Sequence, residues 1–224
     1  MASLLTGSPG AENSVRRARE ADLAAIGAVH ARSWGGPYAQ VLPREVVAAL
    51  DADQLADAWR TAVTEPPSPA HTVHVALGDG IVAGFAAAAP ATDGTDPAGG
   101  DETDGSGDAD GTEEGDGTDG SGGGVEVVAL EVDPLHTRRG HGSRLLAAVA
   151  DTARAAGATH LLAWVHVDDA GRAEFLRGAG FAEDGARRRR ALDDADLDEP
   201  ADGLGDGARS VWPEVRFVAW LVEE

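Results

Sequence analysis

The chain has 224 residues, of which 39 are acidic and 18 are basic, so its formal net charge is −21. Every basic residue is an arginine and there is no cysteine, which excludes lysine Schiff bases, thiolate catalysis, disulfides and cysteine-based zinc sites. The negative charge disfavours nonspecific binding to nucleic acid or anionic membranes. No window contains the roughly 18 apolar residues of a membrane span. We therefore expect a cytoplasmic protein with one domain plus additional segments.

The first part of the chain predicts one short strand and two helices. Residues 1–14 are expected to be a flexible N-terminus, followed by a strand over residues 15–18. Asp22 can cap a helix whose apolar residues recur at helical spacing and which ends at Gly35. A single second helix is predicted from Pro43 to Glu65.

The pattern then changes to that of strands. Residues 71–77 and 81–89 are joined by Gly78-Asp79-Gly80, which is a strong hairpin signal. A further strand is predicted over residues 125–132. The three strands are expected to be consecutive and antiparallel.

An acidic insertion over residues 91–124 interrupts this sheet. It holds eleven acidic residues, twelve glycines and no basic residue. Such a segment repels itself and has little apolar surface to bury, so it predicts a disordered low-complexity loop. A partial calcium-loop pattern begins at Asp110, but Ser121 stands where the bidentate glutamate belongs. We therefore favour a solvating linker.

After the strand over residues 125–132, a glycine-containing turn opens an amphipathic helix. The turn runs Thr137-Arg138-Arg139-Gly140-His141-Gly142-Ser143. Glycines allow the backbone to approach a ligand, and the first N–H groups of a helix have no partner within it. The helix dipole and the two arginines add positive potential at the same place. The turn predicts a diphosphate-binding site.

This turn, preceded by Val132-Asp133-Pro134, resembles the acetyl-CoA-binding core of the GNAT superfamily of N-acetyltransferases. The first motif position holds Thr137 where the family has Arg or Gln. After a strand over residues 161–167, residues 169–181 take the place of the family's Asn-containing helix, which ends in Phe-Tyr-x-x-x-Gly-Phe. Leu176 stands at the tyrosine position.

The resemblance implies an α/β (mixed α+β) GNAT fold. Its central mixed, mostly antiparallel sheet would have about seven strands, flanked by about four helices. A single domain would cover residues 15–224, interrupted by the acidic loop over residues 91–124. The last strand is predicted over residues 211–222, after an acidic connection over residues 193–207. The Arg187–Arg190 run is expected at the start of the preceding strand, in intramolecular pairs or as protection of a sheet edge.

The resemblance also implies where acetyl-CoA would bind as cosubstrate. Its diphosphate would lie on the main chain of the turn, and its pantetheine arm would pair with the end of the strand over residues 125–132. The implied cofactor-binding residues are Leu130, Val132, Thr137, Arg138, Arg139, Gly140, His141, Gly142, Ser143 and Asp169.

Two carboxylates are candidates for the general base that takes the proton of an attacking amine. Glu126 and Glu131 lie on one strand at an odd separation, which predicts opposite faces. We prefer Glu126, which lies eleven residues before Thr137, although a solvent-facing structural role stays open for either. The acceptor site is expected to be lined by His30, Trp34, Tyr38 and His166, with His166 also able to relay a proton.

The predicted function is acetyl transfer from acetyl-CoA to a primary amine of a small molecule, protein or peptide, by direct attack and without a metal. No nucleic-acid or membrane partner is expected, and a homodimer stays open. One alternative is a noncatalytic GNAT-like acyl-CoA-binding or regulatory domain, favoured by Leu176 and Thr137. The other is an interaction protein that acts through its acidic loop.

Overall fold

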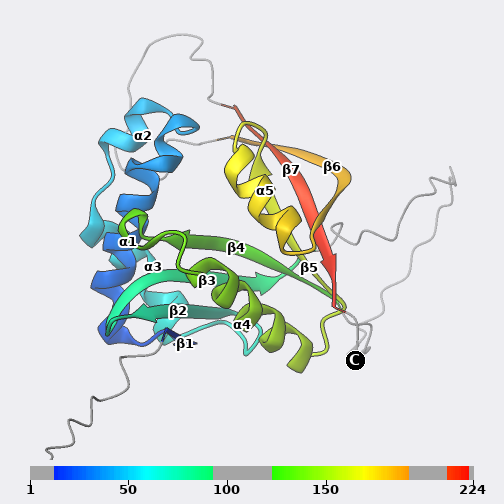
Figure 1. Cartoon of the computed structure of the whole chain (residues 1–224), viewed down its shortest axis with the longest axis horizontal. Helices are drawn as coiled ribbons and strands as arrows, with labels where there is room; N and C mark the ends of the chain where they lie inside the picture. The colour runs from blue at the N-terminus through cyan, green and yellow to red at the C-terminus, as the bar shows by residue number, and fades with distance from the viewer. Residues whose placement is uncertain (1–12, 93–122, 192–210, 222–224) are drawn as a thin grey trace, which may run out of the picture.

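A computed structural model of the chain describes residues 13–92, 123–191 and 211–221, which are coloured in Figure 1. Their strands form one sheet in the order β1-β2-β3-β4-β5-β7-β6. The strands are β1 (Ser14–Arg17), β2 (Thr72–Gly78), β3 (Ile81–Pro90), β4 (Gly124–Val132), β5 (His160–His166), β6 (Ala182–Ala191) and β7 (Val211–Trp220). All neighbours are antiparallel except β4 and β5, which are parallel. The prediction of a mixed, mostly antiparallel sheet is confirmed.

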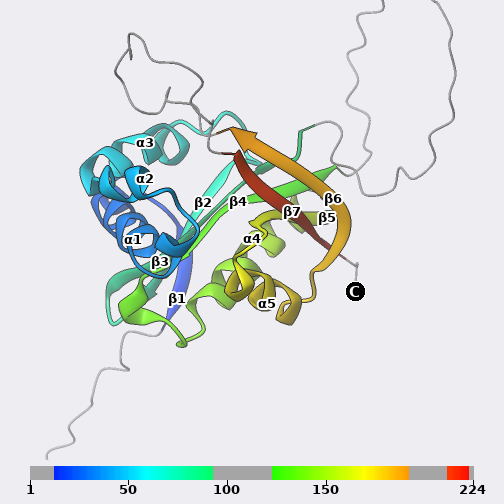
Figure 2. The same ribbon diagram turned by 90° about the horizontal axis from the view of Figure 1, so that it is seen from above.

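Helices cover both faces of the sheet (Figure 2). The helices are α1 (Leu23–Gly35), α2 (Arg44–Ala48), α3 (Ala52–Thr64), α4 (His141–Ala155) and α5 (Ala170–Gly178), with short 3-10 turns η1 (Glu20–Asp22), η2 (Pro37–Gln40) and η3 (Pro134–His136). One apolar core packs the sheet against α4 and α5, and it includes Leu145, Leu176 and Phe217. A second core, with Ile26 and Phe85, packs the other face against α1 and α3.

The parallel pair β4 and β5 separates soon after it begins. Register pairing covers only residues 124–126 of β4 and 160–162 of β5. Figure 1 shows the two strands diverging from their common end. Beyond Glu126, the edge of β4 that faces β5 therefore has no partner strand within the described sheet.

A β-bulge in β4 lies at the start of this separation. Ala87 and Ala88 of β3 pair with Ala129 and Val127, so Val128 is an extra residue on β4. Before the bulge, Val125 and Val127 belong to the core beneath α4. After it, Ala129 belongs to the core beneath α1.

Because of this bulge, one prediction from the sequence was wrong. Strand alternation predicted Glu126 and Glu131 on opposite faces, but the extra residue restores an even spacing between them. Both carboxylates face the α1 side of the sheet, where Glu131 meets Ser33. The prediction was wrong because a bulge of apolar residues leaves no mark on the sequence pattern.

Two helix predictions also need correction. The segment from Pro43 to Glu65 forms two helices, because Asp51 caps α3 by accepting hydrogen bonds from the N–H groups of Asp53 (3.0 Å) and Gln54 (2.9 Å). Asp22 does precede α1, but its carboxylate binds Arg16 in place of the helix N–H groups.

The Arg187–Arg190 run lies at the end of β6 and not at its start, since β6 begins at Ala182. The predicted flexible N-terminus lies almost entirely outside the described residues. Outside them too lie most of the acidic insertion, with its partial calcium-loop pattern, and the whole of the acidic connection over residues 193–207. Within the described ranges, no helix is long and apolar enough to cross a membrane.

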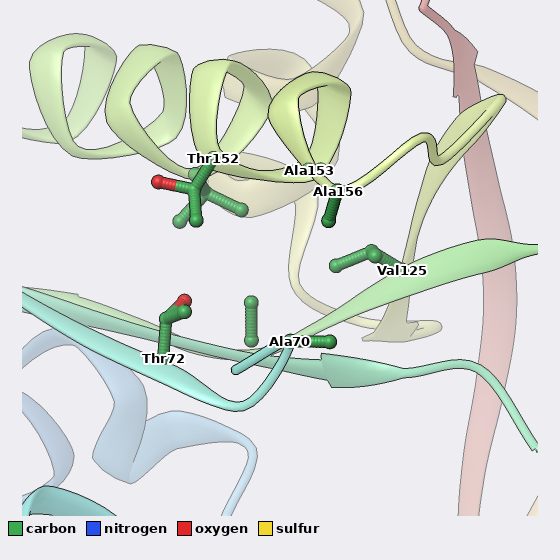
Figure 3. A pocket seen from close by; sticks show the side chains of 8 residues that line it. Ala70, Thr72, Val125, Thr152, Ala153 and Ala156 are labelled. Carbon is green, nitrogen blue, oxygen red and sulfur yellow. The ribbon is translucent and has the colours of Figure 1, made fainter. Parts of the chain in front are cut away.

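Small side chains leave a minor cavity beneath the last turns of α4 (Figure 3). Thr152 and Ala153 of α4, with Ala156 just after it, face Thr72 and Val125 on the strands below. The cavity volume is about 10 Å³, which is close to the least space that one water molecule needs. It is a packing defect of the core and too small for an organic ligand.

Gly27 allows α1 and α3 to pack closely. A Cβ at this position would lie 2.1 Å from the carbonyl oxygen of Ala52 and 2.9 Å from the Cβ of Ala56. We expect Gly27→Ala to lower the free energy of unfolding by about 1–3 kcal/mol, because the helices must move apart. Gly35→Ala is the control, since its Cβ would meet only Leu50 Cδ1, at 3.8 Å. Denaturant unfolding measures both, and equal stability of the two variants would contradict the packing argument.

Buried histidines make the fold sensitive to mild acid. Burial disfavours the imidazolium form and lowers the pKa of His30, His74 and His141. In the unfolded chain histidine titrates near about pH 6.5. Below that pH the unfolded state binds more protons than the folded state, so the free energy of unfolding falls as the pH falls.

We expect the melting temperature to decrease from about pH 7.5 to about pH 5.5, because the unfolded chain takes up protons on histidine in this range and the folded chain takes up fewer. The decrease should be smaller in His74→Gln, which removes an imidazole whose Nε2 lies 3.4 Å from Thr152 Oγ1. Circular-dichroism melts at several pH values measure the slope of the melting temperature against pH for the wild type and for His74→Gln. Identical slopes in the two proteins would exclude a contribution from His74.

Candidate active site

The turn before α4 has the backbone conformation of an anion site. Gly140 (φ 75°) and Arg138 (φ 62°) are both in the left-handed region. Gly140 is the N-cap residue of α4, and no side chain in the described structure caps this helix. The first N–H groups of α4, starting at His141, are therefore available to a ligand at the positive end of the helix dipole.

The turn opens into a groove between α4 and α5, with a volume of about 1010 Å³. Val132 of β4, Gly142 of α4 and Phe175 of α5 line its walls. A Cβ on Gly142 would lie 3.4 Å from Phe175 Cζ and 3.7 Å from Val132 Cγ2, so the walls are close at this point. An elongated ligand with an anionic end fits the groove and the turn together.

Most of the predicted cofactor-binding residues line this groove. They are Val132, Thr137, Arg138, Gly140, His141, Gly142 and Ser143. Sequence reasoning missed Leu146 and Gly171, which line it too. Leu146 follows the glycine turn by one helical turn, so the 3.6-residue period could have indicated it.

Three predicted residues are absent from the groove lining. Leu130 packs against the core beneath α4, and Arg139 lies 3.6 Å from Asp79 of the β2–β3 turn. Asp169 caps α5, because its Oδ1 accepts the N–H of Arg172 at 2.9 Å. The His141 side chain is also buried, and its ring packs beside Gly78, so His141 offers the groove mainly its backbone.

On the α1 face of β4, Glu131 is buried and fully engaged. Its carboxylate accepts hydrogen bonds from Ser33 Oγ (2.5 Å), Arg172 (2.9 Å) and Trp34 Nε1 (3.4 Å). Burial alone would raise the pKa of Glu131, but Arg172 and Ser33 bring it below its ordinary value. Such a carboxylate stays ionised and is a weak proton acceptor.

Glu126 lies on the same face, where the strands separate. Its side chain is 18% exposed, and its Oε1 lies 3.7 Å from Arg188. Arg188 donates a shorter hydrogen bond, of 2.5 Å, to Glu214 and lies over the Trp164 ring at 4.4 Å. Sequence reasoning assigned no site role to Arg188, Glu214 or Trp164, because strands β5, β6 and β7 come together with Glu126 only through the fold.

The predicted acceptor-lining residues form one aromatic row on this face. Trp34 contacts His30 at 4.5 Å and Tyr38 at 5.9 Å between ring centroids. Trp212 continues the row, 6.2 Å from Tyr38 and 4.3 Å from His166. The structure thus brings the four predicted residues together with Trp212, five residues from three separate parts of the chain.

Protonation states along this row follow from burial. His30 is held neutral by burial, which lowers its pKa, and its Nδ1 accepts a hydrogen bond from Trp59 at 3.0 Å. Burial raises the pKa of Tyr38 to about 12, so its hydroxyl stays protonated at neutral pH. Across the residues that the structure describes, no group of three side chains could hold a metal ion.

Comparison with solved structures shows where this fold recurs. The ribosomal-protein-alanine N-acetyltransferase from Brucella melitensis is 18% identical with a TM-score of 0.57, and the match covers 93% of this chain and 99% of that chain. The PaiA N-acetyltransferase from Thermoplasma acidophilum, in complex with coenzyme A, is 14% identical with a TM-score of 0.58, over 93% and 99%. An N-acetyltransferase from Staphylococcus aureus Mu50 is 16% identical with a TM-score of 0.58, over 95% and 100%. These likenesses confirm the predicted fold.

The family is shown by a match to the sequence itself. A search of the curated proteins gave no significant match. Residues 40–181, which make up more than half of the chain, match the profile of the Acetyltransferase (GNAT) family. This span contains the glycine turn, both glutamates of β4 and the whole of α5. The chain belongs to the Acetyltransferase (GNAT) family.

Proposed function

We propose that the chain transfers an acetyl group from acetyl-CoA to a primary amine of a small molecule, protein or peptide. The observation that carries this proposal is the uncapped start of α4, which opens into a long groove beside the unpaired edge of β4. A diphosphate fits the free N–H groups, and Arg138 adds a positive charge at the groove. A linear arm fits the groove beyond.

The unpaired edge of β4 can hold the amide groups of such an arm. Residues 127–132 have no β5 partner in the described sheet, so their N–H and C=O groups can pair with an added strand-like ligand. Val128, at the bulge, is 50% exposed although it lies in a central strand. When bound, acetyl-CoA supplies the thioester whose C–S bond breaks as the amine nitrogen forms the amide.

We assign the role of general base to Glu126. It would take the proton of the attacking amine, directly or through a water molecule. It faces the α1 side at the point where β4 and β5 separate, and its Oε1 lies 3.7 Å from Arg188. Glu131 is unsuited to this role, because three donors already engage its carboxylate.

The departing thiolate does not require a dedicated acid. Leu176, at the position where the family has a tyrosine, is 1% exposed and packs in the core beneath α4. A thiol with a pKa near about 8.5 yields a good leaving group. A leucine at this position therefore does not exclude direct transfer.

The acidic surroundings support a cationic acceptor. The chain carries a net charge of −21, and such a field raises the local concentration of ammonium-bearing molecules. The alternative function, noncatalytic binding of an acyl-CoA, rests on Leu176. Turnover on any amine would exclude it.

A substitution in the turn tests the cofactor site. We expect Gly142→Glu to abolish CoA and acetyl-CoA binding in calorimetry, because it places a bulky carboxylate between Val132 and Phe175 where the diphosphate would lie. Gly142→Ala is the matched control: its Cβ would make contacts of 3.4 Å and longer, so most of the affinity should remain. Wild-type protein that binds neither ligand would overturn the proposed function.

A second substitution tests the base. We expect Glu126→Gln to lower kcat by about 10²-fold or more, the usual contribution of a general base, with an unchanged Kd for CoA. Release of free thiol in a screen of primary amines measures turnover. Glu65→Gln, at an exposed carboxylate beyond α3, should behave as wild type. Wild-type turnover in Glu126→Gln would remove Glu126 from the mechanism.

A further inference from the structure

We propose that the buried ion pair between Glu131 and Arg172 is a positioning device that sets the width of the cofactor groove. The inference rests on the proposed function, because it concerns the site assigned to acetyl-CoA. It gives Glu131 a role other than that of a general base. It also assigns a role to Arg172, which sequence analysis passed over.

The pair joins the two walls of the groove through their nearest chain neighbours. Glu131 directly precedes Val132, which lines the groove on β4, and Arg172 directly follows Gly171, which lines it on α5. The guanidinium of Arg172 lies 2.9 Å from the Glu131 carboxylate. The ion pair therefore links the residue beside one wall to the residue beside the other.

Backbone pairing between β4 and β5 does not hold the walls of the groove at a fixed distance near Glu131. Their register ends at Glu126 and Leu162, and α5 follows β5 on the far side of the gap. The wide end of the gap is thus bridged by side chains. Among the ion pairs of the residues that the structure describes, Glu131–Arg172 joins β4 to α5.

Both partners are held in one geometry. Ser33 and Trp34 donate to Glu131 from α1. Arg172 has Asp169 at 3.4 Å from its Nε and the Tyr38 ring at 4.9 Å from its Cζ. A buried pair gives little net stability unless its partners are satisfied, but removal of one partner is strongly destabilising. The surrounding bonds therefore define a single spacing between the walls.

A second ion pair at the same end of β4 provides a control. Arg32 of α1 lies 2.6 Å from Asp133, the residue after Val132. The Asp133 carboxylate is buried like that of Glu131, but its partner comes from α1 and does not reach α5. Loss of this pair should weaken the fold without releasing the α5 wall.

The experiment measures the Kd of CoA by calorimetry and the melting temperature for Glu131→Gln, Arg172→Gln, the double variant and Arg32→Gln. We expect Arg172→Gln to raise the Kd about tenfold, since the groove is no longer preorganised. Glu131→Gln should also raise the Kd of CoA. The double variant should bind no more weakly than Arg172→Gln alone, because coupled residues are not additive. Arg32→Gln should lower the melting temperature and leave the Kd unchanged.

Arg172→Lys adds a test by partial rescue, because lysine keeps the charge but not the fork of donors. Its Kd should lie between those of wild type and Arg172→Gln. If Arg172→Gln does not fold, the near-isosteric Glu131→Gln variant decides whether the Kd of CoA depends on the ion pair. Folded variants of the pair that bind CoA as wild type does, or an equal loss of affinity in Arg32→Gln, would overturn the inference. Failure of wild type to bind CoA would instead overturn the proposed function.

Discussion

The separation of β4 from β5 is the constraint on which the rest of the structure depends. Two parallel strands that part after three residues expose a strand edge inside the molecule, and unpaired backbone groups there require partners. On one face the gap borders the groove of α4 and α5. On the other it borders the aromatic row and the two glutamates. A ligand held at the edge can therefore be reached from the second face, as a direct transfer between two substrates requires.

Charge is distributed on the two faces in opposite ways. The groove offers free N–H groups and Arg138, which suit a diphosphate even though the chain carries a net charge of −21. On the α1 face, the carboxylates of β4 and β7 lie beside arginines: Glu131 with Arg172, and Glu126 and Glu214 with Arg188. These pairs offset part of the desolvation cost of burying the carboxylates. Arginine alone supplies the cations, consistent with its ability to bind carboxylates through several donors.

Features set by neighbouring residues could be predicted from the sequence, whereas features set by distant contacts could not. The glycine turn and the β2–β3 hairpin were visible, because the conformation of each depends on glycines within the motif itself. The break before α3 was missed, since Asp51 caps a helix in a segment whose apolar spacing continues across it. Arg172 lies 41 residues from Glu131, so its pairing follows only from the topology. The aromatic row was predicted as separate residues, but Trp212 joins it through the pairing of β7 with β5.

The bulge at Val128 explains how acidic residues can lie so close to a site for an anion. If the strand alternated regularly through Val128, without a bulge, Glu131 would point to the α4 side, toward the groove proposed for the diphosphate. Its carboxylate would then repel that ligand. With the bulge, apolar Leu130 and Val132 face the α4 side, and both glutamates face the α1 side. The bulge thus keeps both glutamates away from the groove of α4 and α5, and it places Glu131 2.9 Å from Arg172.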